Sequence, residues 1–176
     1  MIFNVDPDEW LWHSTISGLW IGLLAHLLAG CGSPGESYEV RISPDADYEL
    51  VHTALKDWSE ATGVHFYPTV TSDGCEAQYC IYITTRAKSD IAFNSFYPCS
   101  PTVAGCTLLL KDTQTSDIHI RRGLAPKDAA KSYKHEIGHA LGLSHSSPGT
   151  LMAADITQTA DHVTAADIAQ YWKVRQ

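Results

Sequence analysis

The sequence has little positive charge, and what it has is scattered. Its 176 residues include 12 Lys and Arg against 20 Asp and Glu, which gives a formal net charge of −8. No cluster of basic residues is available to form a phosphate-binding face, so nucleic acid is not an expected partner. Internal repeats are also missing. A chain of this length and composition can form one domain with a substantial hydrophobic core.

Basic residues are missing again before the one long apolar run, residues 16–30, although signal peptides usually begin with positive charge. The run ends in Leu28-Ala29-Gly30-Cys31, which resembles the cleavage box of bacterial lipoproteins. The resemblance implies that Cys31 is lipidated and becomes the mature N-terminus. The alternative is an uncleaved interfacial anchor that uses the tryptophans near the run.

We therefore expect residues 1–31 to be a signal segment and residues 32–37 to be a tether. The protein is expected to be extracytoplasmic, either anchored to a membrane or secreted. Under this reading Cys31 or the apolar run provides the contact with the membrane.

Cysteines are few, and no pair has the C-x₂-C spacing of a thiolate zinc site. Apart from Cys31, the chain has Cys75, Cys80, Cys99 and Cys106. An even number in an exported domain predicts two disulfides. Three connectivities are open, and the short spacings favour Cys75–Cys80 and Cys99–Cys106.

The strongest chemical signal is the stretch HEIGHALGLSH, residues 135–145. On a helix, His135 and His139 lie one turn apart on one face, where two imidazoles can bind Zn²⁺. Gly142 can adopt positive φ, end the helix and bring His145 back as a third ligand. Three histidines leave one coordination position open, which is typical of a catalytic site. Glu136 is placed to act as a general base on water.

This stretch, together with Met152 in the segment GTLMA, resembles the metzincin signature and its Met-turn. Within that clan it is most similar to the matrixins, because Ser146 follows the third histidine and the segment from Ser146 to Met152 is short. The resemblance implies a zinc endopeptidase with Met152 packed beneath the metal. Ala154 stands where matrixins usually have proline and astacins tyrosine, which argues against a tyrosine switch.

A second feature is shared with matrixins. Cys31-Gly32-Ser33-Pro34 matches the C-G-x-P of the matrixin propeptide switch, in which a thiolate occupies the fourth zinc position. Latency through Cys31 is therefore an alternative to its lipidation.

The resemblance also implies a fold class. Residues 38–176 are expected to form an α+β zincin domain, with a twisted, mostly parallel sheet of about five strands and an antiparallel edge strand. Two long helices pack on the sheet, and a further helix follows the Met-turn. Alternation and turn signals predict strands at 38–42, 64–68, 79–84 and 117–121, with the edge strand at 106–110 rather than 91–97.

Helix signals agree with this plan. Ser43-Pro44-Asp45 predicts the start of a helix that Gly63 closes, and Pro126 predicts the start of the helix with the histidines. Thr164 and Asp167 resemble a capping box for the last helix. His119 alternates with isoleucines in the last strand and is interpreted as a strand-surface histidine rather than a ligand.

The functional prediction is a zinc-dependent endopeptidase, with His135, His139 and His145 as ligands of one catalytic zinc and Glu136 as the base. Calcium is permitted by scattered aspartates, but no loop has its ligand spacing. The expected partner is a protein or peptide substrate, and the chain is expected to be a monomer. Two alternatives are a membrane-anchored zinc-containing binding module and a hydrolase of cell-wall peptide crosslinks.

Overall fold

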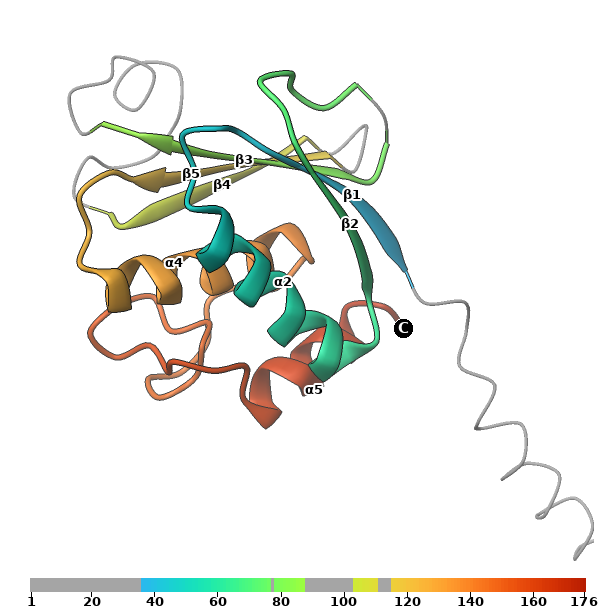
Figure 1. Cartoon of the computed structure of the whole chain (residues 1–176). Helices are drawn as coiled ribbons and strands as arrows, with labels where there is room; N and C mark the ends of the chain where they lie inside the picture. The colour runs from blue at the N-terminus through green and yellow to red at the C-terminus, as the bar shows by residue number, and fades with distance from the viewer. Residues whose placement is uncertain (1–35, 77, 88–102, 111–114) are drawn as a thin grey trace, which may run out of the picture. The chain divides into compact units, whose positions relative to one another are not determined.

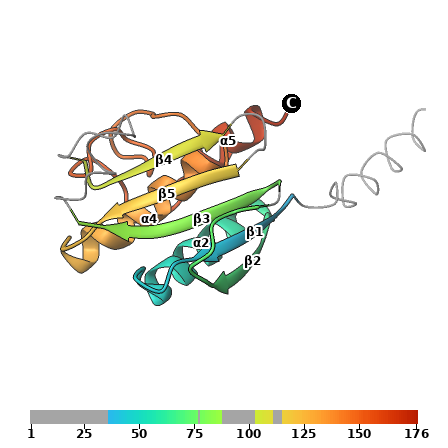
Figure 2. The ribbon, with the colours of Figure 1, turned by 90° about the horizontal axis from the view of Figure 1, so that it is seen from above.

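The computed structural model describes residues 36–76, 78–87, 103–110 and 115–176. In this part of the chain one sheet has the strand order β2-β1-β3-β5-β4. Four neighbouring strands are parallel, and β4 pairs antiparallel with β5 at one edge (Figure 2). The predicted fold class, a mostly parallel sheet with an antiparallel edge strand, is confirmed. The strands are β1 (Ser37–Ile42), β2 (His65–Val70), β3 (Cys80–Arg86), β4 (Gly105–Leu110) and β5 (Thr115–Arg121).

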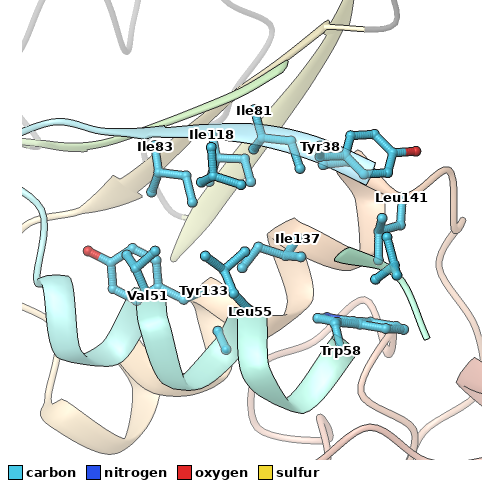
Figure 3. Packing of buried hydrophobic residues seen from close by; sticks show 14 of the residues in the cluster. Tyr38, Val51, Leu55, Trp58, Ile81, Ile83, Ile118, Tyr133, Ile137 and Leu141 are labelled. Atoms are coloured by element: carbon cyan, nitrogen blue, oxygen red, sulfur yellow. The ribbon is translucent and has the colours of Figure 1, made fainter. Parts of the chain in front are cut away.

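The helices lie on one face of the sheet (Figures 1 and 2). They are α2 (Tyr48–Thr62), α4 (Pro126–Ala140) and α5 (Ala165–Lys173). Apolar side chains of α2 and α4 meet those of the sheet in one buried cluster (Figure 3). Trp58 of α2 is fully buried and also donates a hydrogen bond from Nε1 to the carbonyl of Lys134, at 2.8 Å. This contact links α2 to α4 at the level of the histidines.

The predicted start of the first helix was wrong. Ser43 to Ala46 form a turn, closed by a 2.9 Å bond from the Ala46 N–H to the Ser43 carbonyl. The carboxylate of Asp45 accepts from Thr84 Oγ1 at 3.2 Å, so it ties the turn to β3 instead of capping the helix. Asp47 is the cap, and its side chain accepts from the Leu50 N–H. The predicted end is confirmed, because Gly63 has φ 78°.

The edge strand and one disulfide were predicted correctly. β4 covers the favoured segment, whereas the rival segment 91–97 lies outside the described residues. Cys75 and Cys80 form a disulfide. Cys106 is also disulfide-bonded, and its predicted partner Cys99 lies outside the described residues.

The signal segment, the tether up to residue 35 and Cys31 lie outside the described residues as well. Lipidation, membrane anchoring and latency through Cys31 therefore stay predictions. Within the described part, no helix has both the length and the apolar character needed to cross a membrane.

Candidate metal centre

Helix α4 positions the first two histidines and the glutamate. Pro126 occupies its first turn, where a missing N–H costs nothing, and the helix runs to Ala140. The rings of His135 and His139 are 4.7 Å apart between centroids, as expected for positions one turn apart. The opposite side of the helix is buried in the core through Tyr133 and Ile137. The same helix therefore anchors itself and presents the imidazoles.

A sharp turn after α4 brings the third histidine to the first two. Gly142 has φ 86°, a left-handed conformation that favours glycine. The N–H of Gly142 donates to the carbonyl of His139 at 2.8 Å, and the N–H of Leu143 donates to that of Gly138 at 3.0 Å. The chain reverses, and the ring centroid of His145 lies 4.8 Å from that of His139.

The three imidazoles form a donor set that fits zinc. One ligand atom from each of His135, His139 and His145 lies within 4.8 Å of the others. Nδ1 of His135 bonds to the carbonyl of Leu151 at 2.8 Å, and Nδ1 of His139 bonds to that of Leu143 at 2.7 Å. Because a carbonyl only accepts, each Nδ1 carries the hydrogen and each Nε2 is left as a lone-pair donor.

The protonation state also suits metal binding. Burial, followed by the neighbouring His135, lowers the pKa of His139 to about 4. Burial is the main cause that lowers the pKa of His135 as well. Both rings are therefore neutral near pH 7, which is the form that binds a metal.

Helix α5 contacts the Met-turn through hydrogen bonds. The carboxylate of Asp167 is fully buried and accepts the N–H groups of Leu151 at 3.0 Å and Met152 at 3.2 Å. The carbonyl of Leu151 is the same group that fixes His135. Met152 is buried, and its sulfur lies so close to Gly138 that a Cβ there would collide with it. The helix, the turn and the first histidine are thus coupled.

Glu136 lies beside the imidazoles in an environment of low polarity. It is 5 % exposed, and burial raises the pKa of its carboxyl to about 7. Thr107 of β4 donates from Oγ1 to Oε2 of Glu136 at 2.7 Å. The glutamate therefore lies between its own helix and the edge strand.

A cleft of about 610 Å³ contains these groups. One side is formed by residues 103–107 and Leu109, and the other by residues 153–156 and Thr159, which follow the Met-turn. His135, Glu136, His139 and His145 all line it. The cleft places the candidate metal site and an edge strand next to each other.

The structure thus brings together all four residues predicted for the site. His119 is not part of the histidine group, but its expected position on the strand surface was wrong. It is 5 % exposed, because both faces of β5 are buried at that position. Sequence reasoning missed the roles of Asp167, which was interpreted as a helix cap only, and of Thr107, whose strand pattern carries no chemical signal.

Three comparisons with known proteins were made, and the family model agrees with this site. A family model described as matrixin matches residues 36–174. Among curated proteins no significant match was found. The fold is similar to that of a zinc-dependent peptidase from Methanocorpusculum labreanum, with 12% identity, a TM-score of 0.49, and 76% of this chain and 99% of that chain covered. It is also similar to archaemetzincin from Archaeoglobus fulgidus, with 16% identity, a TM-score of 0.46, and coverage of 75% and 99%.

Proposed function

The chain belongs to the matrixin family of zinc-dependent peptidases, and on this premise we propose that it is an endopeptidase with Glu136 as general base. His135, His139 and His145 would hold one zinc ion. The observation that carries the proposal is the convergence of the three imidazoles beside a buried glutamate in an open cleft. The oriented Nδ1–H groups of His135 and His139 favour the same assignment.

Zinc, when bound, supplies a Lewis acid that polarises the scissile carbonyl and acidifies water. Glu136 takes a proton from the attacking water and delivers it to the leaving amine. In the metal-free site burial raises the pKa of this carboxyl to about 7. The positive charge of a bound zinc ion would favour the ionised carboxylate, which is the form that accepts the proton.

We propose that the substrate binds in an extended conformation along β4. Among the described residues β4 pairs with β5 alone, so one side of its backbone can receive another strand. The cleft lies at this strand and contains Glu136. A peptide that pairs with β4 would therefore present its backbone carbonyl to the base and the metal.

The test compares the full-length protein with its Glu136→Gln variant, each loaded with stoichiometric zinc and incubated with an unstructured protein. Glutamine keeps the shape of the side chain but cannot accept a proton, so kcat should fall by roughly 10²–10⁴-fold. Zinc content should stay at that of the unmodified protein. Glu60→Gln is the matched control, because Glu60 is exposed on α2, where it pairs with Lys56. Equal cleavage by the Glu136→Gln variant would remove Glu136 from the mechanism.

The same assays distinguish the alternatives. Cleavage of peptidoglycan peptides without cleavage of proteins would favour a cell-wall hydrolase. Absence of cleavage from a broad peptide library, with a partner bound in the presence of chelator, would favour a binding module.

A further inference from the structure

Two residues of the edge strand lie next to the carboxylate of Glu136. Thr107 Oγ1 lies 2.7 Å from Oε2 and 3.0 Å from the backbone carbonyl of Glu136 itself. A Cβ on Gly105 would lie 2.8 Å from Cγ and 2.8 Å from Oε1 of the same side chain. Residues 105 and 107 are two positions apart in a strand, so they face the same side. One oxygen of the carboxylate therefore accepts a hydrogen bond from β4. The other lies where a side chain at position 105 would collide with it.

The hydroxyl of Thr107 is suited to a group that gains and loses a proton. A hydroxyl has one hydrogen and two lone pairs, and its hydrogen rotates. Facing a carboxylate, Thr107 donates to Oε2. When Glu136 holds the transferred proton, its O–H can donate to Thr107 Oγ1, while the threonine hydrogen turns to the carbonyl 3.0 Å away. Thr107 thus has a partner in both states, and the carboxyl keeps its orientation.

We infer that Thr107 is a positioning residue for Glu136, and that Gly105 provides the space in which that orientation is reached. The inference rests on the proposed function, since it takes Glu136 as the base. It adds that the strand proposed to bind substrate also fixes the orientation of the base. The geometry of substrate and base then depends on one element.

Threonine is also a good strand former, so a purely structural role must be separated from positioning. Valine has nearly the same shape and the same preference for strands but no hydroxyl. Serine has the hydroxyl but lacks the methyl group. Thr69 of β2 is an exposed strand threonine far in sequence from the site, and Thr69→Val is the matched control.

The first experiment measures kcat and KM of zinc-loaded full-length protein on one peptide. Misplacement of a catalytic group by about 1 Å can cost about 10²-fold, so Thr107→Val is expected to lower kcat by roughly 10–100-fold. KM and zinc content should change less than about twofold, because the ligands and the backbone of β4 are untouched. Thr107→Ser should keep kcat within about threefold of the unmodified protein, and Thr69→Val should match it. A Thr107→Val variant as active as the unmodified protein, or a serine variant as impaired as the valine variant, would overturn the inference.

The second experiment does not depend on activity. Crystal structures of the zinc-loaded protein and of its Thr107→Val variant should differ in the rotamer of Glu136, with the carboxylate displaced in the variant. An unchanged rotamer would overturn the inference whatever the kinetics. Failure of the unmodified protein to cleave any peptide would instead refute the proposed function, and the structures would still decide whether Thr107 orients Glu136.

Discussion

Asp167 offers the sharpest test of how the fold supports the metal site. Its Oδ2 accepts the N–H of Leu151 at 3.0 Å, the N–H of Thr164 at 2.8 Å and the hydroxyl of Thr164 at 2.6 Å. Its Oδ1 accepts the N–H of Met152 at 3.2 Å. In Asp167→Asn, one oxygen becomes an amide nitrogen that faces donors. The least costly orientation places this nitrogen at Oδ1, where it loses the bond from Met152.

The magnitude follows from these bonds. Leaving the buried N–H of Met152 without an acceptor costs about 1–3 kcal/mol. The other bonds lose their charge assistance, which is worth on the order of 1 kcal/mol each. We expect Asp167→Asn to lower the free energy of unfolding by about 4–6 kcal/mol, compared with the 5–15 kcal/mol or so of a typical domain. The Met-turn should loosen, and zinc affinity should fall by roughly tenfold or more, because Leu151 no longer fixes His135 as firmly.

The assay combines urea denaturation of the metal-free protein with competitive zinc titration. Thr164→Val is the matched control, since it removes the hydroxyl of the capping box but keeps the bonds from Asp167 to the Met-turn. Loss of this cap should cost about 1 kcal/mol and leave zinc affinity within about twofold. If Asp167→Asn cost no more than Thr164→Val, and zinc bound equally well to both, the coupling between α5 and the metal site would be refuted.

Two further predictions concern buried groups. Gly138→Ala adds a Cβ against the sulfur of Met152 and 2.9 Å from Cζ2 of Trp58. Overpacking should outweigh the helix-propensity gain of about 1 kcal/mol, so the free energy of unfolding should fall by a net amount of about 1–2 kcal/mol, as measured by thermal unfolding. A rise in stability would contradict the contact. Burial, followed by the charge of Arg86, lowers the pKa of His119 from its ordinary value of 6.5 to about 4. As the pH falls, the His119 ring is protonated near pH 6.5 in the unfolded chain but only near pH 4 in the folded protein. The stability that His119 contributes above pH 6.5 is therefore lost between pH 6.5 and about 4. The loss is at most about 3 kcal/mol before discounting for water near the ring. His119→Asn should flatten the pH dependence of the unfolding free energy over that range, and an unchanged slope in urea titrations would count against the assignment.

Features set by local sequence signals were predicted correctly, whereas a feature set by a tertiary contact was not. Gly63, Pro126 and the capping box of Thr164 and Asp167 were read correctly, because each acts within a few residues of itself. The start of α2 was misread because Ser43-Pro44-Asp45 carries a valid capping pattern. The carboxylate of Asp45 instead bonds to Thr84, which lies 39 residues away.

Burial of polar residues was equally hidden from sequence. Alternation in β5 predicts a polar outward face at His119, but the ring is buried. In α5, Tyr171 is buried, whereas the neighbouring Trp172 is 51% exposed. Neighbouring residues of one element differ in exposure according to what other segments cover, and periodicity does not contain that information.

What the sequence alone determined is the set of reactive groups: three imidazoles and a carboxylate whose spacing is dictated by helical geometry and by one glycine turn. Such spacing is local, so eleven residues, 135–145, specify it. Only the tertiary structure decided how these groups are supported. Thr107 lies 29 residues from Glu136, and Asp167 lies 16 residues from Leu151. A hydrogen bond between distant residues exists only once the strands and helices have packed, because no local rule brings its two partners together.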